Sequence, residues 1–162
     1  MNRSLLEKLS NLLITKNLII CTAESCTGGL LANYLTDLSG SSQWFELGFI
    51  TYSNKAKSNI LGVCTETLTQ YGSVSQETVV EMAKGALLKS SADISISISG
   101  VAGPTGTDSQ YPIGSVWFAV TSKNTIKTYL KHFTGNRKEV REKATQYAIE
   151  ILIKFIHSYP TY

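Results

Sequence analysis

Residues 92–100 read ADISISISG, and this stretch decides the fold class. Isoleucine and serine alternate along it, which is the period of a β-strand whose two faces differ. Ile94, Ile96 and Ile98 form one apolar face. The other face carries small serines where a solvent-exposed strand would carry lysine or glutamate, so we expect that face to be covered as well. A strand covered on both faces predicts a sheet between two layers of helices.

The rest of the chain supplies helices and further strands around this stretch. Apolar residues recur at helical spacing in several segments, some of which begin at capping residues such as Ser53, Ser75 and Asn136. We expect helices over 3–15, from Cys26, after Ser53, from Thr65 to Gly72, after Ser75 and from Asn136, and strands over 18–21, within 44–52, over 115–120 and over 125–133. This order predicts one α/β domain over residues 1–162, a three-layer α/β/α sandwich with a mixed, mostly parallel sheet.

Composition and charge exclude several classes of protein. The 162 residues are 43% hydrophobic and 17% charged, which is typical of a globular domain. A net charge of +3, spread along the chain, gives no nucleic-acid signal. No apolar run approaches the roughly 18 residues of a membrane span, and the amphipathic start is unlike a secretory signal. Three cysteines cannot all pair within the chain, so we expect reduced thiols and a cytoplasmic protein.

Residues 23–29, AESCTGG, place two nucleophiles, Ser25 and Cys26, between a predicted strand and a predicted helix. The start of a helix offers backbone N–H groups without intrahelical partners, and Gly28 and Gly29 would leave them accessible to an oxyanion or a phosphate. The same pattern also fits a tight turn built from small residues. Cys26 is a rival to Ser25, because a helix N-terminus lowers the pKa of a thiol.

A nucleophilic serine needs a base, and the candidates are few. His132 and His157 lie in the late hairpin and near the C-terminus, so neither is well placed. A lysine can act as a base when burial lowers its pKa. Lys55 and Lys57 follow the strand FITY, and Lys57 is the better candidate only if it faces inward. No spacing of cysteine, histidine or carboxylate residues indicates a metal site.

Six stretches resemble, in order, the CinA C-terminal domain family: TAESCTGGLLA, GSSQWFELGFITYSNKAK, ILGV, YGSVSQETVVEMAKGA, SISGVAGPTG and PIGSVWFA. The resemblance covers residues 5–156. It implies an α/β/α sandwich and a homo-oligomer. For the family members that stand alone, it also implies a cofactor-independent Ser/Lys amidohydrolase, which converts nicotinamide mononucleotide (NMN) to nicotinic acid mononucleotide and ammonia in pyridine-nucleotide recycling.

The family motifs match individual residues of this chain. The family's serine nucleophile matches Ser25, its general-base lysine matches Lys57, and a tyrosine of its site matches Tyr52. An arginine needed for activity matches Arg137, with Arg141 one helical turn later as the second candidate. Chemistry alone suggests the other substrate-binding residues, which are Cys26, Thr27, Gly28 and Gly29 for the oxyanion and Gly103, Thr105 and Gly106 for ribose or phosphate.

Two departures from the family pattern leave alternatives open. A loop that often reads GPDGG reads GPTGT here, with Thr105 and Thr107 in place of an acid and a glycine, which concerns substrate affinity more than the dyad. The family's GDR is GNR here, a mild change because Asn136 can also cap a helix. Some relatives carry the fold without amidase activity. The alternative function is therefore a non-catalytic nucleotide-binding or interaction module related to competence-damage inducible proteins.

Overall fold

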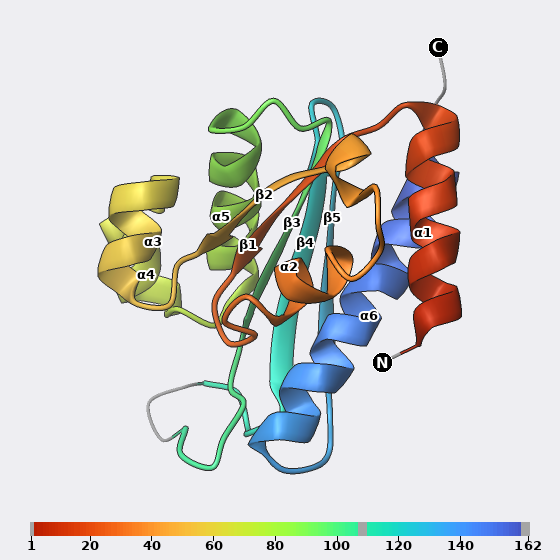
Figure 1. The fold of residues 1–162 in the computed structure, drawn as a ribbon. Helices are drawn as coiled ribbons and strands as arrows, with labels where there is room; N and C mark the ends of the chain where they lie inside the picture. Colours follow the sequence, from red (N-terminus) through yellow and green to blue (C-terminus); the bar gives the residue numbers. More distant parts are fainter. Residues whose placement is uncertain (1, 107–109, 160–162) are drawn as a thin grey trace.

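The computed structural model describes residues 2–106 and 110–159, and its centre is a five-stranded sheet (Figure 1). The strands are β1 (Ile20–Glu24), β2 (Phe45–Ile50), β3 (Ile94–Gly100), β4 (Ser115–Ser122) and β5 (Ile126–His132), in the spatial order β2-β1-β3-β4-β5. Strands β2, β1 and β3 are parallel, β4 is antiparallel to β3, and β5 is antiparallel to β4. Only β4 therefore runs against the others, which confirms a mixed, mostly parallel sheet.

Helices lie on both sides of the sheet, which confirms the three-layer α/β/α sandwich (Figure 1). On one side are α1 (Arg3–Lys16), α2 (Leu30–Leu35) and α6 (Arg137–His157), with α1 and α2 packed against α6. The other face is covered by α5 (Gln76–Leu88), against which α3 (Asn54–Leu61) and α4 (Thr65–Tyr71) pack. A short 3₁₀ helix, η1 (Ser41–Gln43), precedes β2.

Strand β3 is covered on both faces, as its alternating pattern predicts. The serine face lies against α5 and the loop before it, where the hydroxyl groups donate to backbone carbonyls. Hydroxyls this small let the helix approach the sheet closely while each polar group keeps a partner. The three pairs are Ser95 with Ala83, Ser97 with Val79 and Ser99 with Ser73.

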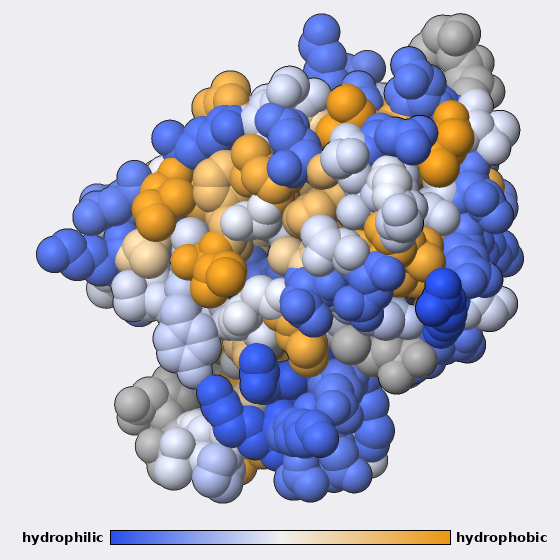
Figure 2. Space-filling view, viewed as in Figure 1, coloured by the Kyte–Doolittle hydropathy of each residue, from blue (hydrophilic) through white to orange (hydrophobic). Residues whose placement is uncertain are grey.

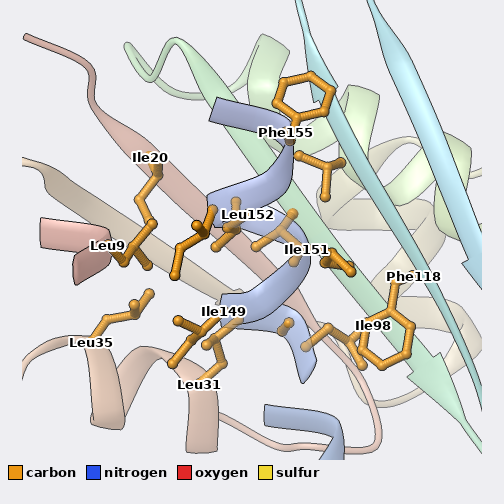
Figure 3. Packing of buried hydrophobic residues seen from close by; sticks show 14 of the residues in the cluster. Leu9, Ile20, Leu31, Leu35, Ile98, Phe118, Ile149, Ile151, Leu152 and Phe155 are labelled. Atoms are coloured by element: carbon orange, nitrogen blue, oxygen red, sulfur yellow. The ribbon is translucent and has the colours of Figure 1, made fainter. Parts of the chain in front are cut away.

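The isoleucine face of β3 belongs to the main hydrophobic core, which lies between the sheet and helices α1, α2 and α6 (Figure 3). Burying one such side chain contributes about 1.5–3 kcal/mol, so this core is the main source of stability. Its labelled members in Figure 3 are Leu9, Ile20, Leu31, Leu35, Ile98, Phe118, Ile149, Ile151, Leu152 and Phe155.

Three predicted boundaries are wrong in detail. Strand β1 spans Ile20–Glu24 rather than 18–21, because Asn17 ends α1 in a left-handed conformation and residues 22–24 pair with strands on both sides. Helix α2 begins at Leu30 rather than near Cys26, because Gly28 and Gly29 have φ of 58° and 92°, outside the helical region. Thr65, which its residue type suggests as the cap of the helix before Gly72, is instead the first residue of α4, and Cys64 is the N-cap. The predicted caps Ser53, Ser75 and Asn136 are confirmed.

The strand directions bring several loops to one edge of the sheet. Since β1, β2 and β3 run parallel, their carboxyl ends lie at the same edge of the sheet. The chain leaves β1 into residues 25–29, β2 into residues 51–53 and β3 into residues 101–106. Strand β5 also ends at this edge, so α6 begins there. Residues from four distant parts of the sequence can therefore meet.

The surface differs between the middle of the molecule and this edge. In Figure 2 hydrophobic residues gather over edge strand β2, whereas the lower part, where α6 begins, is mostly hydrophilic. Ile50 at the end of β2 and Ile60 of α3 are among the large apolar side chains that remain exposed. Within residues 2–106 and 110–159, none of the helices combines the length and the hydropathy needed to cross a bilayer.

Candidate active site

Ser25 and Lys57 are in direct contact at the carboxyl edge of the sheet. The Lys57 ammonium nitrogen Nζ lies 2.9 Å from Ser25 Oγ. Nζ also donates to the backbone carbonyls of Thr51 at 3.0 Å and Tyr52 at 3.3 Å. The Lys57 side chain is only 1% exposed, so it faces inward, which is the condition for it to act as a base.

Local structure explains how Lys57 reaches this position. Ser53 caps helix α3 by accepting the N–H of Ala56, which fixes the first turn of the helix. Lys57 lies one turn from the cap, on the buried face, whereas Lys55 is exposed. The Thr51 N–H donates to the carbonyl of Glu24, which ties the start of this segment to the end of β1. Lys57 and Ser25 are thus held by segments that directly follow two neighbouring parallel strands, β2 and β1.

Burial changes the proton affinity of Lys57. Loss of solvent lowers its pKa from 10.5 to about 8, against a smaller raising effect of Cys26. A neutral amine has two N–H donors and one lone pair. The carbonyls of Thr51 and Tyr52 can take the two donors, so the lone pair is left for the hydroxyl of Ser25. This arrangement suits a lysine that accepts a proton from serine.

Cys26 is buried next to Ser25 but is chemically the opposite of an activated thiol. Burial raises its pKa to about 12, and the Glu24 carboxylate adds to this effect, while its own backbone N–H, Lys57 and Arg141 oppose it. The expectation that a helix N-terminus lowers this pKa is wrong. Helix α2 begins only at Leu30, so the thiol does not lie at its first turn.

The first turn of α2 is not open to a substrate, which corrects a second expectation. The carboxylate of Glu24 accepts the N–H groups of Gly29, Leu31 and Ala32. Among the described residues of the turn, the N–H groups without a partner residue lie before Gly28 in the chain. In the described part of the molecule, the N–H groups of Cys26 and Thr27 donate to no other residue. Gly28 donates its N–H to the carbonyl of Ser25.

The two candidate arginines have different partners. Arg137, at the start of α6, donates to the carbonyl of Gly103 at 2.8 Å and to the Tyr52 hydroxyl at 2.9 Å. Arg141 donates instead to the carbonyls of Cys26 at 3.1 Å and Thr27 at 2.8 Å. Arg137 therefore borders the space above the dyad, whereas Arg141 holds the turn that carries Ser25.

Two cavities that share part of their lining lie at this edge, and only the inner one is lined by both Ser25 and Lys57. The inner one, of about 200 Å³, is lined by Ser25, Cys26, Tyr52, Lys57, Ser73, Val74, Ser99, Gly100, Ala102 and Arg137. The outer one, of about 740 Å³, shares Tyr52, Ser73, Val74, Gly100, Ala102 and Arg137 with it and adds Asn54, residues 68–72, Val101, Thr105, Gly106 and Gln110. Among these lining residues no side chain is acidic, and Arg137 is the cation of the outer cavity. Thr107 lies outside the described residues.

The match to a family model decides which family this is. Residues 2–156 match the model of the CinA C-terminal domain. The chain belongs to the CinA C-terminal domain family.

Family members with curated names and solved structures resemble the chain closely. It is 49% identical to nicotinamide-nucleotide amidohydrolase PncC of Shigella flexneri and equally to that of Escherichia coli K12, over 90% of this chain and 89% of each relative. It is 45% identical to a putative competence-damage inducible protein of Caldicellulosiruptor saccharolyticus, of which it spans 38%. The solved structure of a CinA superfamily protein from Klebsiella pneumoniae has a TM-score of 0.95 and 37% identity, covering 98% of this chain and 100% of that one.

Sequence reasoning missed several residues that shape the site. Glu24 was noted only as a member of AESCTGG, and the backbone carbonyl of Thr51 carries no sequence signal at all. Ser73 and Ser99 line the inner cavity, with Ser99 donating to the Ser73 carbonyl. The unusual serine face of β3 was the one available clue, because its last member lies where the strand reaches the loops.

Proposed function

We propose that this protein hydrolyses the carboxamide of NMN to nicotinic acid mononucleotide and ammonia through a Ser25–Lys57 dyad, in pyridine-nucleotide recycling. The observation that carries the proposal is the 2.9 Å contact between Lys57 Nζ and Ser25 Oγ at the base of a cavity. The names of two relatives that are each 49% identical to this chain supply the substrate. A homo-oligomeric state and a cytoplasmic location stay predictions.

The proposed reaction has two stages. Neutral Lys57 takes the proton of Ser25 while Oγ attacks the carboxamide carbon, which gives a tetrahedral intermediate. Lys57 then passes this proton to the departing nitrogen, and the C–N bond breaks. Ammonia is released, and the acyl group stays bound to Ser25 as an ester. A water molecule, deprotonated by Lys57, attacks the ester, and Lys57 passes that proton to Ser25 Oγ as the ester bond breaks. The carboxylic acid released gives its own proton to the solvent and leaves as the carboxylate. These steps use only protein groups and water.

The backbone of the turn supports the intermediate in this scheme. The negative charge develops on the former amide oxygen, and preorganised N–H groups beside the nucleophile are the usual way to stabilise it. Cys26 and Thr27 are the members of AESCTGG whose N–H groups donate to no other described residue. We assign them this role through the backbone, and the buried side chain of Thr27 takes no part.

We assign the ribose phosphate of NMN to the outer cavity. Its described lining is polar and largely neutral, with Arg137 as the cation. A guanidinium can bind a phosphate with two hydrogen bonds, so the phosphate would replace Tyr52 or Gly103 as partner of Arg137. Thr105 and Gly106 line the same cavity and would contact the ribose. Arg141 is assigned to the turn instead.

Ammonia release from NMN tests the proposal. The purified protein is expected to release ammonia and form nicotinic acid mononucleotide in equal amounts. Nicotinamide, which lacks the ribose phosphate, is the matched control substrate and should react far more slowly, because it cannot use Arg137. A folded protein that binds NMN without releasing ammonia would contradict the proposal and favour the non-catalytic binding module.

Replacing Cys26 with alanine is expected to leave kcat for ammonia release within about threefold of the wild type. The thiol has a pKa of about 12, so it is protonated at neutral pH. The neighbouring lysine, Lys57, contacts the hydroxyl of Ser25 instead. The measurement is steady-state kinetics with NMN. Loss of turnover in a folded Cys26→Ala protein would mean that the thiol of Cys26, and not Ser25, is the nucleophile.

The pH profile should follow the protonation of Lys57. Because the neutral amine is the active form and burial lowers the pKa of Lys57 to about 8, kcat/KM should rise with pH and level off above that value. At saturating NMN the midpoint in kcat should lie lower, since the positively charged pyridinium ring disfavours a second cation nearby. Initial rates between about pH 6 and pH 10 would measure both. A flat kcat/KM profile over this range would contradict the base assignment.

A further inference from the structure

Glu24 is a buried carboxylate directly before the nucleophile. Its side chain is 0% exposed, and in the described chain it forms no ion pair with a lysine or arginine. Its oxygens accept the N–H groups of Gly29 at 3.0 Å, Leu31 at 3.1 Å and Ala32 at 2.8 Å. Burying a carboxylate is costly unless such charge-assisted hydrogen bonds compensate for the lost water.

A simple capping role does not require this arrangement. Serine or asparagine at the N-cap would satisfy the first turn of a helix without a buried charge, but the N-cap of α2 is Gly29, which has no side chain. Glu24 reaches the helix from before the turn, so its carboxylate joins the residue that precedes Ser25 to the residues that follow Gly28. The two ends of the turn that carries Ser25 are therefore held together by hydrogen bonds to one carboxylate.

Arg141 holds the same turn from its other side. Its guanidinium binds the carbonyls of Cys26 and Thr27, while Glu24 binds N–H groups at the end of the turn. The Ser25 N–H is held by the carbonyl of Ile98 in β3 at 2.9 Å. Within the part of the chain that is described, the N–H groups of Cys26 and Thr27 donate to no other residue, and Cys26 lines the inner cavity.

We infer that Glu24 is a positioning residue, which fixes the Ser25–Gly29 turn so that Ser25 Oγ meets Lys57 and the N–H groups of Cys26 and Thr27 face the reacting carbonyl. The role in NMN hydrolysis rests on the proposed function. Glu24 itself is absent from the lining of both cavities, and its oxygens are taken by backbone N–H groups. It acts through the turn and does not touch the substrate.

The test uses a fluorophosphonate reagent, which reacts with an activated serine and does not require NMN as substrate. The full-length wild type and a Glu24→Gln variant are incubated with the reagent, and the rate of mass increase at Ser25 is measured by mass spectrometry. The glutamine keeps the length but presents an amide group to backbone N–H donors. We expect labelling to slow by about 100-fold, as for a displaced nucleophile. With NMN, kcat should fall by a similar factor while KM stays unchanged.

Glu46→Gln is the matched control. Glu46 is an exposed carboxylate on β2 that also accepts a backbone N–H, that of Ser91, but it is remote from both cavities. Its variant should be labelled at the wild-type rate. Arg141→Met, which releases the carbonyl side of the same turn, should slow labelling without raising KM for NMN.

Each result decides the inference. A folded Glu24→Gln protein labelled at the wild-type rate overturns it. If that variant does not fold, Arg141→Met decides, and wild-type labelling of that protein overturns it. A wild type that takes no label also overturns it, since Ser25 is then not activated. A wild type that is labelled but releases no ammonia from NMN contradicts only the proposed substrate, and the comparison of variants still stands.

Discussion

Replacement of Ser25 by alanine is expected to lower kcat for ammonia release from NMN by at least about 10⁴-fold. Ser25 Oγ is the atom that forms the bond to the carboxamide carbon, and Lys57 Nζ lies 2.9 Å from it. A methyl group in its place cannot form the ester intermediate. Whatever rate remains would come from N–H groups that polarise the amide for direct attack by water.

Binding of NMN should survive this substitution. The contacts proposed for the ribose phosphate come from Arg137 and the outer cavity, which the change does not touch. Calorimetric titration with NMN would therefore give a similar Kd for Ser25→Ala and the wild type. Ser58→Ala, a serine on α3 next to Lys57 and absent from the lining of both cavities, is the control. More than about a tenth of wild-type turnover in Ser25→Ala would rule out Ser25 as the nucleophile.

Replacement of Lys57 by methionine should lower kcat/KM by about 10³-fold, within the range for loss of a general base. Methionine fills a similar volume but cannot take the proton of Ser25. Lys55→Met, two residues earlier on the same helix and exposed, removes the same charge and should leave kcat/KM unchanged. Steady-state kinetics with NMN at about pH 8 would measure both. Equal losses in the two variants would contradict a specific role of Lys57.

The same substitution should make the protein more stable. The pKa of Lys57 is lowered from 10.5 to about 8 in the folded chain, so keeping it protonated at neutral pH costs about 3 kcal/mol. Methionine removes this cost, but the Thr51 carbonyl loses a donor, which offsets part of the gain. We expect the free energy of unfolding at pH 7 to rise by about 1–2 kcal/mol.

Chemical denaturation at several pH values would check the cause. Because the unfolded chain binds more protons than the folded one between about pH 8 and pH 10.5, wild-type stability should increase with pH across that window. Below the window both states carry the proton, and the penalty is constant. The advantage of Lys57→Met over the wild type should therefore shrink as the pH rises. A constant difference would mean that burial of charge is not the reason.

Several elements were predictable because their signals are local. The alternation over residues 94–99 and the capping residues Ser53, Ser75 and Asn136 depend on neighbours within a few positions. The resemblance to family motifs predicts Ser25 and Lys57 as the dyad, a role that stays a proposal, and the structure brings their side chains into contact. The expected start of α2 at Cys26 failed because hydrophobic periodicity does not report φ, and two adjacent glycines in left-handed conformations delay the helix.

The sequence by itself determined the order of helices and strands, the cover on both faces of β3 and the presence of a nucleophile between a strand and a helix. Only the tertiary structure decided that Lys57 faces inward while Lys55 does not. It also decided that Arg137 donates to Tyr52 whereas Arg141 donates to the carbonyls of the turn. It placed the Glu24 carboxylate on the N–H groups at the start of α2. The reason is physical. These contacts depend on the order and direction of strands that are far apart in the chain, and a residue's pKa depends on what that packing removes from water.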